Sequence, residues 1–160
     1  MDSTIQKHTN GLNMLVQREG IDYFEGLNDW VLSQAHDYIC NQSYWSPGIP
    51  IDLFSLGLKH SWNFSAFEGP RLVAFSRLVT DYATFAYLGD VFVLPEFRGK
   101  GISKNLMEII FSQSRASQLR RIILATKDAH SLYSKYGFQQ LENPENIMQI
   151  IRSSEDLYGQ

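Results

Sequence analysis

The stretch Asp90-Val-Phe-Val-Leu-Pro-Glu-Phe-Arg-Gly-Lys-Gly-Ile-Ser103 decides the fold that the sequence predicts. An apolar run ends at Pro95, a short basic turn with two glycines follows, and apolar residues then recur at the spacing of an amphipathic helix. The free N–H groups of a helix N-terminus and the helix dipole favour an anion at such a turn. We therefore predict that a strand, a glycine turn and a helix N-terminus form a pyrophosphate site.

The residue types of the turn suit a phosphate. Gly99 and Gly101 let the backbone approach a ligand closely, because neither carries a Cβ atom. Arg98 and Lys100 add positive charge to a chain whose formal net charge is -3. A mildly acidic protein lacks the basic surface that nucleic acid or an anionic membrane requires. We therefore expect no nucleic acid and no membrane as partners.

Length and composition indicate one folded domain. The chain has 160 residues, of which 44% are hydrophobic and 19% are charged, so disorder is excluded as a description of the whole. The single cysteine, Cys40, excludes a disulfide framework within one chain, and we interpret it as a small core residue rather than a nucleophile. The N-terminus has no signal-peptide pattern, and no apolar run is long enough for a membrane span. We expect a cytoplasmic protein.

Hydrophobic periodicity predicts an α/β fold in a single domain at residues 14–151, with tails at 1–13 and 152–160, the first of them frayed. Three strands separated by short turns should form an antiparallel meander, and a long helix should then cross over to a strand parallel to the third. Alternation in the first of these strands predicts one buried face, whereas the third is apolar on both faces and should lie centrally. The expected strands are 14–18, 62–67, 71–80, 85–94, 120–126, 138–141 and 147–151, and the expected helices are 27–40, 51–59, 101–117 and a short one capped by Asp128. Together they predict a mixed, mostly antiparallel central sheet with flanking helices.

A second stretch, Ala129-His-Ser-Leu-Tyr-Ser-Lys-Tyr-Gly-Phe138, follows the predicted crossover. Together the two stretches resemble the GNAT superfamily of N-acetyltransferases. The first is similar to the family's acetyl-CoA loop, Arg/Gln-x-x-Gly-x-Gly/Ala, with Arg98, Gly101 and Ser103 at its fixed positions. The second is similar to the family's Ala-x-x-Leu-Tyr-x-Lys-x-Gly-Phe segment. Since the order of strands and helices also matches from residue 14 to residue 151, the resemblance implies a GNAT-like fold.

The resemblance implies where acetyl-CoA binds. The third strand of the meander and the strand after the long helix should part at their ends, and the pantetheine arm would lie in the gap against the backbone of Val91, Phe92 and Val93. The pyrophosphate would lie on the backbone amides of Gly99, Lys100, Gly101, Ile102, Ser103 and Lys104. Two positions depart from the family pattern. Ser103 stands where the family has Gly or Ala, and Thr126 stands where many members carry an Asn that contacts the pantetheine arm.

Acetylation of an amine requires an amine free of its proton, a stabilised oxyanion and a proton for the departing thiolate. The family's tyrosine maps to Tyr133, whose phenol would donate that proton, although an aromatic residue at helical spacing is otherwise a core residue. The backbone N–H near Val93 would polarise the carbonyl. Asp90 is the candidate general base, because it is the one charged residue in an apolar strand, and an ion pair with Arg77 explains it equally well. We interpret His130 as a surface or capping residue, with the role of general base as the lesser alternative. A chain of waters is a further route by which the proton of the amine could leave.

The resemblance implies an enzyme that transfers an acetyl group from acetyl-CoA to an amine of a small molecule or peptide, by direct attack in a ternary complex. The alternative is a non-catalytic GNAT-like module that senses acyl-CoA or docks a protein through aromatic residues such as Tyr44, Trp45 and Tyr82. Acceptor specificity should lie in residues 27–61 and 80–84, whose aromatic residues suit an apolar or aromatic amine and are equally explained by packing. The four histidines are scattered, so no metal site is predicted. Homodimers are common in the family, and the sequence leaves the oligomeric state of this chain open.

Overall fold

The computed structural model describes residues 3–159, and its sheet has six strands in chain order, β1-β2-β3-β4-β5-β6. Neighbouring strands are antiparallel from β1 to β5, whereas β6 runs parallel to β5. The strands are β1 (Asn13–Arg18), β2 (Ile21–Glu25), β3 (Ser61–Glu68), β4 (Arg71–Thr80), β5 (Phe85–Val93) and β6 (Arg121–Ile123). The predicted mixed, mostly antiparallel sheet is confirmed, as is the meander from β3 to β5.

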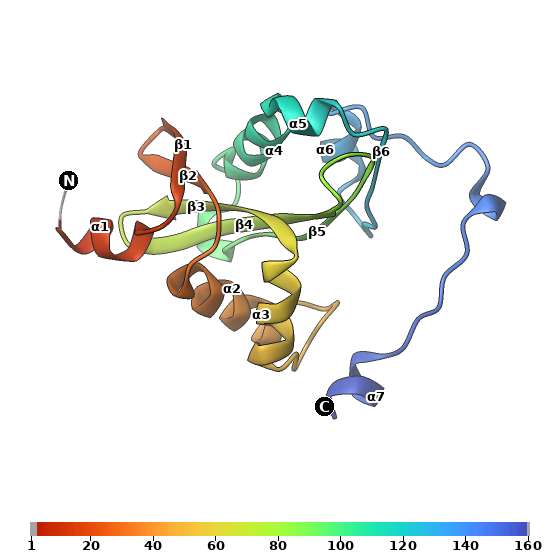
Figure 1. Ribbon diagram of the computed structural model, residues 1–160, viewed down its shortest axis with the longest axis horizontal. Coiled ribbons are helices and arrows are strands. Elements are labelled where there is room, and N and C mark those ends of the chain that lie inside the picture. The colour runs from red at the N-terminus through yellow and green to blue at the C-terminus, as the bar shows by residue number, and fades with distance from the viewer. Residues whose placement is uncertain (1–2, 160) are drawn as a thin grey trace.

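Helices cover both faces of this sheet (Figure 1). One face carries α2 (Asp29–Asn41) and α3 (Ile51–Lys59), and the other carries α4 (Ile102–Ser112), α5 (Ser114–Ser117) and α6 (His130–Ser134). Each layer has its own apolar core. The α4 layer buries, among others, Phe64, Leu78, Leu106, Ile110 and Tyr133. The α2 layer buries, among others, Val31, Ile39, Leu58, Phe75 and Phe92.

Asn28 is the N-cap of helix α2. The side chain of Asn28 accepts a hydrogen bond from the N–H of Val31 at 2.8 Å, which satisfies one of the amides that a helix N-terminus leaves free. The buried residues of α2 are Val31, Ala35, Tyr38 and Ile39, which recur at helical spacing and face the sheet. The helix predicted at residues 27–40 is thus present, with bounds of Asp29–Asn41.

Two predictions about burial are wrong. The strand β3 is buried along nearly its whole length rather than at alternate residues, because helices cover both faces of the sheet here. The strand β5 is fifth of six rather than central, and its first residues are covered on one face only. Phe85 and Tyr87 remain 39% and 37% exposed. Apolar composition therefore did not distinguish a fully covered strand from one beside a short edge strand.

Other element boundaries also differ from the prediction. The helix expected at 101–117 divides at Gln113, whose backbone is extended with φ −66° and ψ 128°. The strand β2 has no counterpart in the sequence prediction. The start expected to be frayed contains the helix α1 (Ser3–Thr9), so that expectation is wrong for these residues. The first two residues lie outside the described part of the chain.

The chain after α6 leaves the domain and runs apart from it (Figure 1). The strands predicted at 138–141 and 147–151 are wrong, because this segment contains only a 3-10 turn, η2 (Pro144–Asn146), and the short helix α7 (Ser154–Tyr158). We call residues 139–153 the C-terminal arm. The arm is attached again at its far end, where Oγ of Ser154 donates to the carbonyl of Trp45 at 3.4 Å.

Candidate active site

The strands β5 and β6 separate after a short pairing. Residues Phe85–Tyr87 pair with Arg121–Ile123, and there the ladder ends. Within residues 3–159, the rest of β5 has β4 on one side and no strand on the other. The predicted parting of these two strands is confirmed. The backbone of residues 91–93 therefore lies beside an open edge, where an extended ligand can bond like an added strand.

Asp90 lies at a β-bulge immediately before this open segment. The register between β4 and β5 shifts between Phe75 and Arg77, and Asp90 takes a left-handed conformation with φ 51°. Aspartate adopts this conformation more readily than most residues. A bulge bends and twists its strand, so this one contributes to the separation of β5 from β6.

Arg98 holds the turn that follows β5. Its Nε donates to the carbonyl of Val93 at 3.0 Å, and its Nη2 donates to the Tyr38 hydroxyl at 3.1 Å. These two bonds tie the turn to β5 and to α2. A guanidinium has five N–H donors, so Arg98 retains donors for an anion beside the turn.

The backbone between Arg98 and α4 is open to a ligand. Gly99 and Gly101 have φ of 76° and 77°, and a Cβ atom at either position would meet nothing within 4 Å. Within residues 3–159, the amides of residues 99–104 donate no hydrogen bond, whereas the Asn105 amide donates to the Gly101 carbonyl at 2.9 Å. Consecutive free N–H groups thus surround the N-terminus of α4, where the helix dipole favours negative charge.

Tyr133 lies in α6 with its ring in the core and its hydroxyl unpaired. The residue is 8% exposed, and its ring makes an edge contact of 5.9 Å with Phe138. Its hydroxyl makes no hydrogen bond within the described residues, and the hydroxyl oxygen is not fully buried. Burial raises the pKa of Tyr133 to about 12, and repulsion from the Tyr44 phenol, the Asp128 carboxylate and the Tyr87 phenol acts in the same direction, the two phenols only once they ionise at high pH. The phenol is therefore protonated at neutral pH and accessible to a ligand.

Thr126 positions the segment that leads into α6. Its Oγ1 accepts a hydrogen bond from the Ala129 amide at 3.0 Å. Asp128 was expected to cap this helix, but the N-cap is Ala129 and makes no side-chain capping bond, so that expectation is wrong. The Thr126 hydroxyl still has its own hydrogen to donate.

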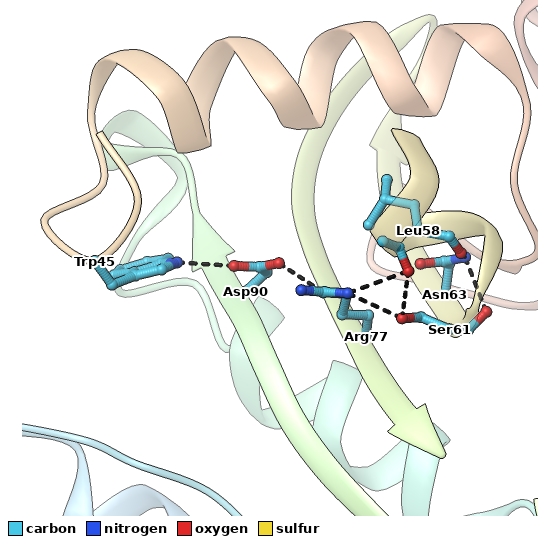
Figure 2. A network of polar contacts seen from close by, with 7 residues as sticks. Trp45, Leu58, Ser61, Asn63, Arg77 and Asp90 are labelled. Carbon is cyan, nitrogen blue, oxygen red and sulfur yellow. Dashed lines mark hydrogen bonds and ion pairs between the residues drawn. The ribbon is translucent and has the colours of Figure 1, made fainter. Parts of the chain in front are cut away.

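Asp90 forms the centre of a polar network on the α2 side of β5 (Figure 2). Its Oδ2 accepts from Nε of Arg77 at 2.6 Å, and its Oδ1 accepts from the indole Nε1 of Trp45 at 2.8 Å. The side chain of Asp90 is only 8% exposed. The ion pair with Arg77, one of the two interpretations that the sequence allows, is thus present. The role of Asp90 as general base remains a prediction, because each carboxylate oxygen can accept more than one hydrogen bond.

The network continues from Arg77 to the end of α3. Nη1 of Arg77 donates to the carbonyl of Gly57 at 3.2 Å and to Oγ of Ser61 at 3.0 Å (Figure 2). Glycine is unfavourable in a helix interior. The contact with Arg77 explains why a glycine nevertheless occupies position 57 in α3. A Cβ atom at position 57 would lie 3.3 Å from Nη1 of Arg77, which is closer than most side chains tolerate.

The loop between α2 and α3 presents two aromatic side chains on this side of the molecule. Trp45 packs its ring edge-on against Tyr44, with 5.0 Å between the ring centroids. The ammonium of Lys127, from the segment after β6, lies 4.1 Å from the centroid of the Tyr44 ring. Tyr44 is 57% exposed. A cationic amine is therefore already accommodated on an aromatic face of this loop.

Metal ligands and membrane spans are both missing from the part of the chain that the structure describes. Within residues 3–159, no group of three or more His, Cys, Asp and Glu side chains is arranged to hold a metal ion. Across the same residues, no helix combines the length and the apolar character needed to cross a membrane.

The sequence of this chain is similar to a family of known proteins. A model of the acetyltransferase (GNAT) family matches residues 27–138. The chain belongs to the GNAT family of acetyltransferases. The GNAT match covers the sheet from β3 to β6, the open edge of β5, the glycine turn and α6.

Individual GNAT relatives are similar over parts of the chain. A protein from Xanthomonas campestris pv. campestris, described as a GNAT acetyltransferase, has a solved structure that is 39% identical, with a TM-score of 0.78 over 86% of this chain and 97% of that one. An uncharacterized N-acetyltransferase, ycf52, of Porphyra purpurea is 29% identical over 69% of this chain and 66% of its own length. Thialysine N-epsilon-acetyltransferase of Bos taurus is 34% identical over 49% of this chain and 51% of its own length. The chain thus spans about half to two thirds of these two curated GNAT relatives.

The predicted site residues of this GNAT chain fall into two groups. The backbone residues of β5 and of the glycine turn lie along one open path, and Tyr133 has an unpaired hydroxyl in α6. Asp90 instead points to the α2 side of the sheet, into contact with Trp45. The contact between Trp45 and Asp90 was not predicted from the sequence. The only sequence signal for Trp45 is its position in a loop bounded by prolines.

Proposed function

We propose that the protein transfers an acetyl group from acetyl-CoA to an amine of a small molecule or peptide, by direct attack in a ternary complex. The observation that carries this proposal is the run of free amides at residues 99–104, which continues the open edge of β5. An anion and an extended arm can be held there by backbone alone. Membership of the acetyltransferase family supports acetyl-CoA as the ligand of this path.

The open backbone of the glycine turn and of β5 supports acetyl-CoA as the ligand. The pyrophosphate would accept hydrogen bonds from the amides of residues 99–104, where the space beside Gly99 and Gly101 is open. The pantetheine arm would pair with the backbone of Val91, Phe92 and Val93. Thr126 has a hydroxyl hydrogen to offer to the arm from the other side of the gap. When bound, acetyl-CoA supplies the activated thioester that an amine attacks.

Tyr133 is proposed as the general acid. Its hydroxyl has no protein acceptor within residues 3–159, so its hydrogen is available to a sulfur atom. A pKa of about 12 keeps the phenol protonated at neutral pH, as a proton donor requires. Burial of the ring fixes the position of the hydroxyl without using its hydrogen. The N–H near Val93 is proposed as the group that polarises the thioester carbonyl.

Asp90 is retained as the candidate base, with a second role in positioning. Arg77 and Trp45 each occupy one of its carboxylate oxygens, and Trp45 belongs to the loop beside which an acceptor would approach. If Asp90 takes the proton of the amine, its substitution by Asn removes turnover at every acceptor concentration. If Asp90 only orders the Trp45 loop, the same substitution raises KM for the acceptor more than it lowers kcat.

A primary amine on a flexible chain is the proposed acceptor. The Lys127 ammonium already lies over the Tyr44 ring, which supports recognition of such an amine by the aromatic loop. The name of the bovine relative also refers to an N-epsilon amine, although the chain covers 51% of that protein. The cytoplasmic location expected from the sequence remains a prediction.

Two measurements test the proposal. Isothermal titration calorimetry with acetyl-CoA should show binding, and the absence of binding at millimolar cofactor would exclude the proposed path. Release of free thiol from acetyl-CoA should then increase when amines are added, and aliphatic primary amines should give the fastest release. Binding without thiol release for every amine in a broad panel would favour a non-catalytic acyl-CoA sensor.

A further inference from the structure

A pocket of about 280 Å³ opens on the α4 side of the sheet, and none of the residues proposed to hold acetyl-CoA lines it. It lies where the end of β2, the start of β3, the turn after β4 and the break between α4 and α5 meet. Its lining residues are Glu25, Trp62, Tyr82, Gln113, Ser114 and Arg115. The pocket therefore combines two aromatic rings with one carboxylate and one guanidinium.

Trp62 and Tyr82 form an aromatic corner in this pocket. Their ring centroids are 5.8 Å apart, and the ring planes are inclined by 40°. The indole Nε1 of Trp62 donates to Oε2 of Glu25 at 3.0 Å, and Oε1 of Glu25 accepts from Nδ2 of Asn13 at 2.9 Å. Two hydrogen bonds thus hold the carboxylate at the edge of the indole. Aromatic faces beside a carboxylate favour a cation.

The backbone holds the Tyr82 ring in this corner despite local strain. Tyr82 has φ 63°, a left-handed conformation that bulky side chains rarely adopt. The turn is fixed by Asp81, whose Oδ1 accepts from the amides of Ala83, Thr84 and Phe85. Strained residues persist where the surrounding structure determines them, and they are concentrated at ligand sites. The position of Tyr82 is therefore built into the turn.

Glu25 and Arg115 bring opposite charges to this pocket, and neither forms an ion pair within residues 3–159. Nη1 of Arg115 donates to the Tyr82 carbonyl at 3.2 Å, which leaves other donors of the guanidinium for a ligand. Both charges act on the Tyr82 phenol. Burial raises the pKa of this phenol, the Glu25 carboxylate raises it further, and the Arg115 guanidinium lowers it. The pocket is thus suited to a ligand that carries both signs of charge.

The chemistry of each end of such a ligand follows from its neighbours. Each carboxylate oxygen of Glu25 already accepts one hydrogen bond, so the corner offers few acceptors for the three N–H groups of a primary ammonium. Aromatic faces bind a methylated ammonium, which needs no acceptor. At the other end, the guanidinium of Arg115 matches the single charge and two oxygens of a carboxylate. A phosphate monoester carries more charge than one guanidinium balances.

We propose that this pocket binds a small zwitterion with a trimethylated ammonium at one end and a carboxylate at the other. The ammonium lies against Trp62 and Tyr82 beside Glu25, and the carboxylate accepts hydrogen bonds from Arg115. A trimethylated nitrogen has no N–H to exchange for an acetyl group, so this ligand is not the acceptor, although the sequence assigns residues 80–84 to acceptor specificity. The proposal is independent of the proposed acetyl transfer, because it rests only on the residues of this pocket.

Heteronuclear NMR of the full chain tests the site through its three tryptophans. The indoles of Trp30, Trp45 and Trp62 donate to different groups, so each reports on a different part of the molecule. On titration with γ-(trimethylammonio)butyrate, the indole N–H signal of Trp62 should shift and that of Trp45 should not. No shift at millimolar ligand would overturn the proposal. A shift at Trp45 instead would also overturn it, because the ligand would then bind beside Asp90.

Three related compounds test the two ends of the ligand separately. Tetramethylammonium lacks the carboxylate, butyrate lacks the cation, and γ-aminobutyrate replaces the methylated ammonium with a primary one. Each should bind at least about tenfold more weakly than γ-(trimethylammonio)butyrate, as measured by isothermal titration calorimetry. Equal affinity for tetramethylammonium would overturn the role of Arg115. Equal affinity for γ-aminobutyrate would overturn the assignment of a methylated cation.

Two pairs of variants locate the binding. Tyr82→Gly removes one aromatic face and should weaken binding by more than about tenfold. Glu19→Gly is its matched control, because Glu19 also has a left-handed backbone, with φ 51°, and lies in the turn between β1 and β2. Glycine relieves the strain at both positions, so both variants should remain folded, which their melting temperatures verify.

Arg115→Gln should reduce the affinity for the zwitterion to that for tetramethylammonium. Arg120→Gln is its matched control, because Arg120 is exposed and does not line the pocket, and it should leave binding unchanged. Unchanged binding in Tyr82→Gly or in Arg115→Gln would overturn the proposal. Equal weakening in a variant and in its control would overturn it as well, because the ligand would then bind without using this pocket.

Discussion

The indole Nε1 of Trp45 lies 2.8 Å from Oδ1 of Asp90 and joins the loop between α2 and α3 to the bulge of β5. The other carboxylate oxygen of Asp90 is bonded to Arg77, so one buried carboxylate connects three separate elements. The loop proposed to lie beside the acceptor is thereby fixed relative to the strand proposed to hold the donor. Changes in either partner of Asp90 should affect stability and acceptor binding together.

Replacement of Arg77 by Met should destabilise the fold by about 3 kcal/mol, because it leaves the carboxylate of Asp90 buried without its counter-charge. The value is measured as the change in the free energy of unfolding from urea denaturation. Asp90→Asn in the same assay provides the second arm of a double-mutant cycle. The double variant should lose less than the sum of the single losses, and strict additivity would show that the ion pair contributes nothing.

Gly101→Glu should abolish acetyl-CoA binding, because a carboxylate would enter the space proposed for the pyrophosphate. The matched control is Gly20→Glu in the turn between β1 and β2. Gly20 has φ 79° against 77° for Gly101, and a Cβ atom added at either position would meet nothing within 4 Å. Both variants should lose about 1–2 kcal/mol of stability from left-handed strain. Calorimetry should detect the loss of binding in Gly101→Glu alone, and equal loss in both would point to strain instead.

Tyr133→Phe should slow turnover by about a hundredfold and leave the affinity for acetyl-CoA nearly unchanged. The hydroxyl has no protein partner within residues 3–159, so its removal should not alter the melting temperature. Tyr136→Phe is the control, since it removes a hydroxyl from the next turn of the same segment, where it donates to the Lys104 carbonyl at 3.0 Å. Unchanged turnover in Tyr133→Phe would remove this residue from the acid role.

The ratio of kcat between wild type and Tyr133→Phe should stay constant from neutral pH up to about pH 10, the ordinary pKa of tyrosine. Burial raises the pKa of Tyr133 in the folded state to about 12. A folded pKa above the unfolded one means that the stability linked to this proton is fully present below about pH 10 and is lost as pH rises through about 12. A ratio that falls already near pH 9 would indicate that the phenol ionises at its ordinary pKa.

The sequence predicts the glycine turn before α4 well because the pattern is local, and its role in binding a phosphate stays a prediction. Gly99 and Gly101 lie between an apolar run and a helical pattern, and the structure has the free amides that this order implies. The position of Tyr133 could be predicted from a motif, whereas its unpaired hydroxyl could not. The contact between Trp45 and Asp90 was beyond sequence reasoning, because it joins residues 45 positions apart through a loop with no regular period.

The strand predictions failed where pairing with a distant strand, rather than the local residue composition, decides whether a segment forms a strand. Residues 147–151 have a strand composition, yet they form no strand because the arm runs apart from the sheet (Figure 1). In β3 and β5, apolar composition did not report which face a helix would cover. The short strand β2 was missed because five residues give too little period to recognise. These errors concern the relation between distant segments, which local patterns do not contain.

The short ladder between β5 and β6 has a consequence for the energetics of the sheet. With pairing limited to Phe85–Tyr87, we expect β6 to be the strand whose local unfolding costs least free energy. A donor molecule lying along the open edge would bridge the two strands and raise that cost. The affinity for the donor and the free energy of local unfolding of β6 are then thermodynamically linked. A substitution that destabilises β6 should therefore weaken donor binding even if the substituted residue makes no contact with the donor.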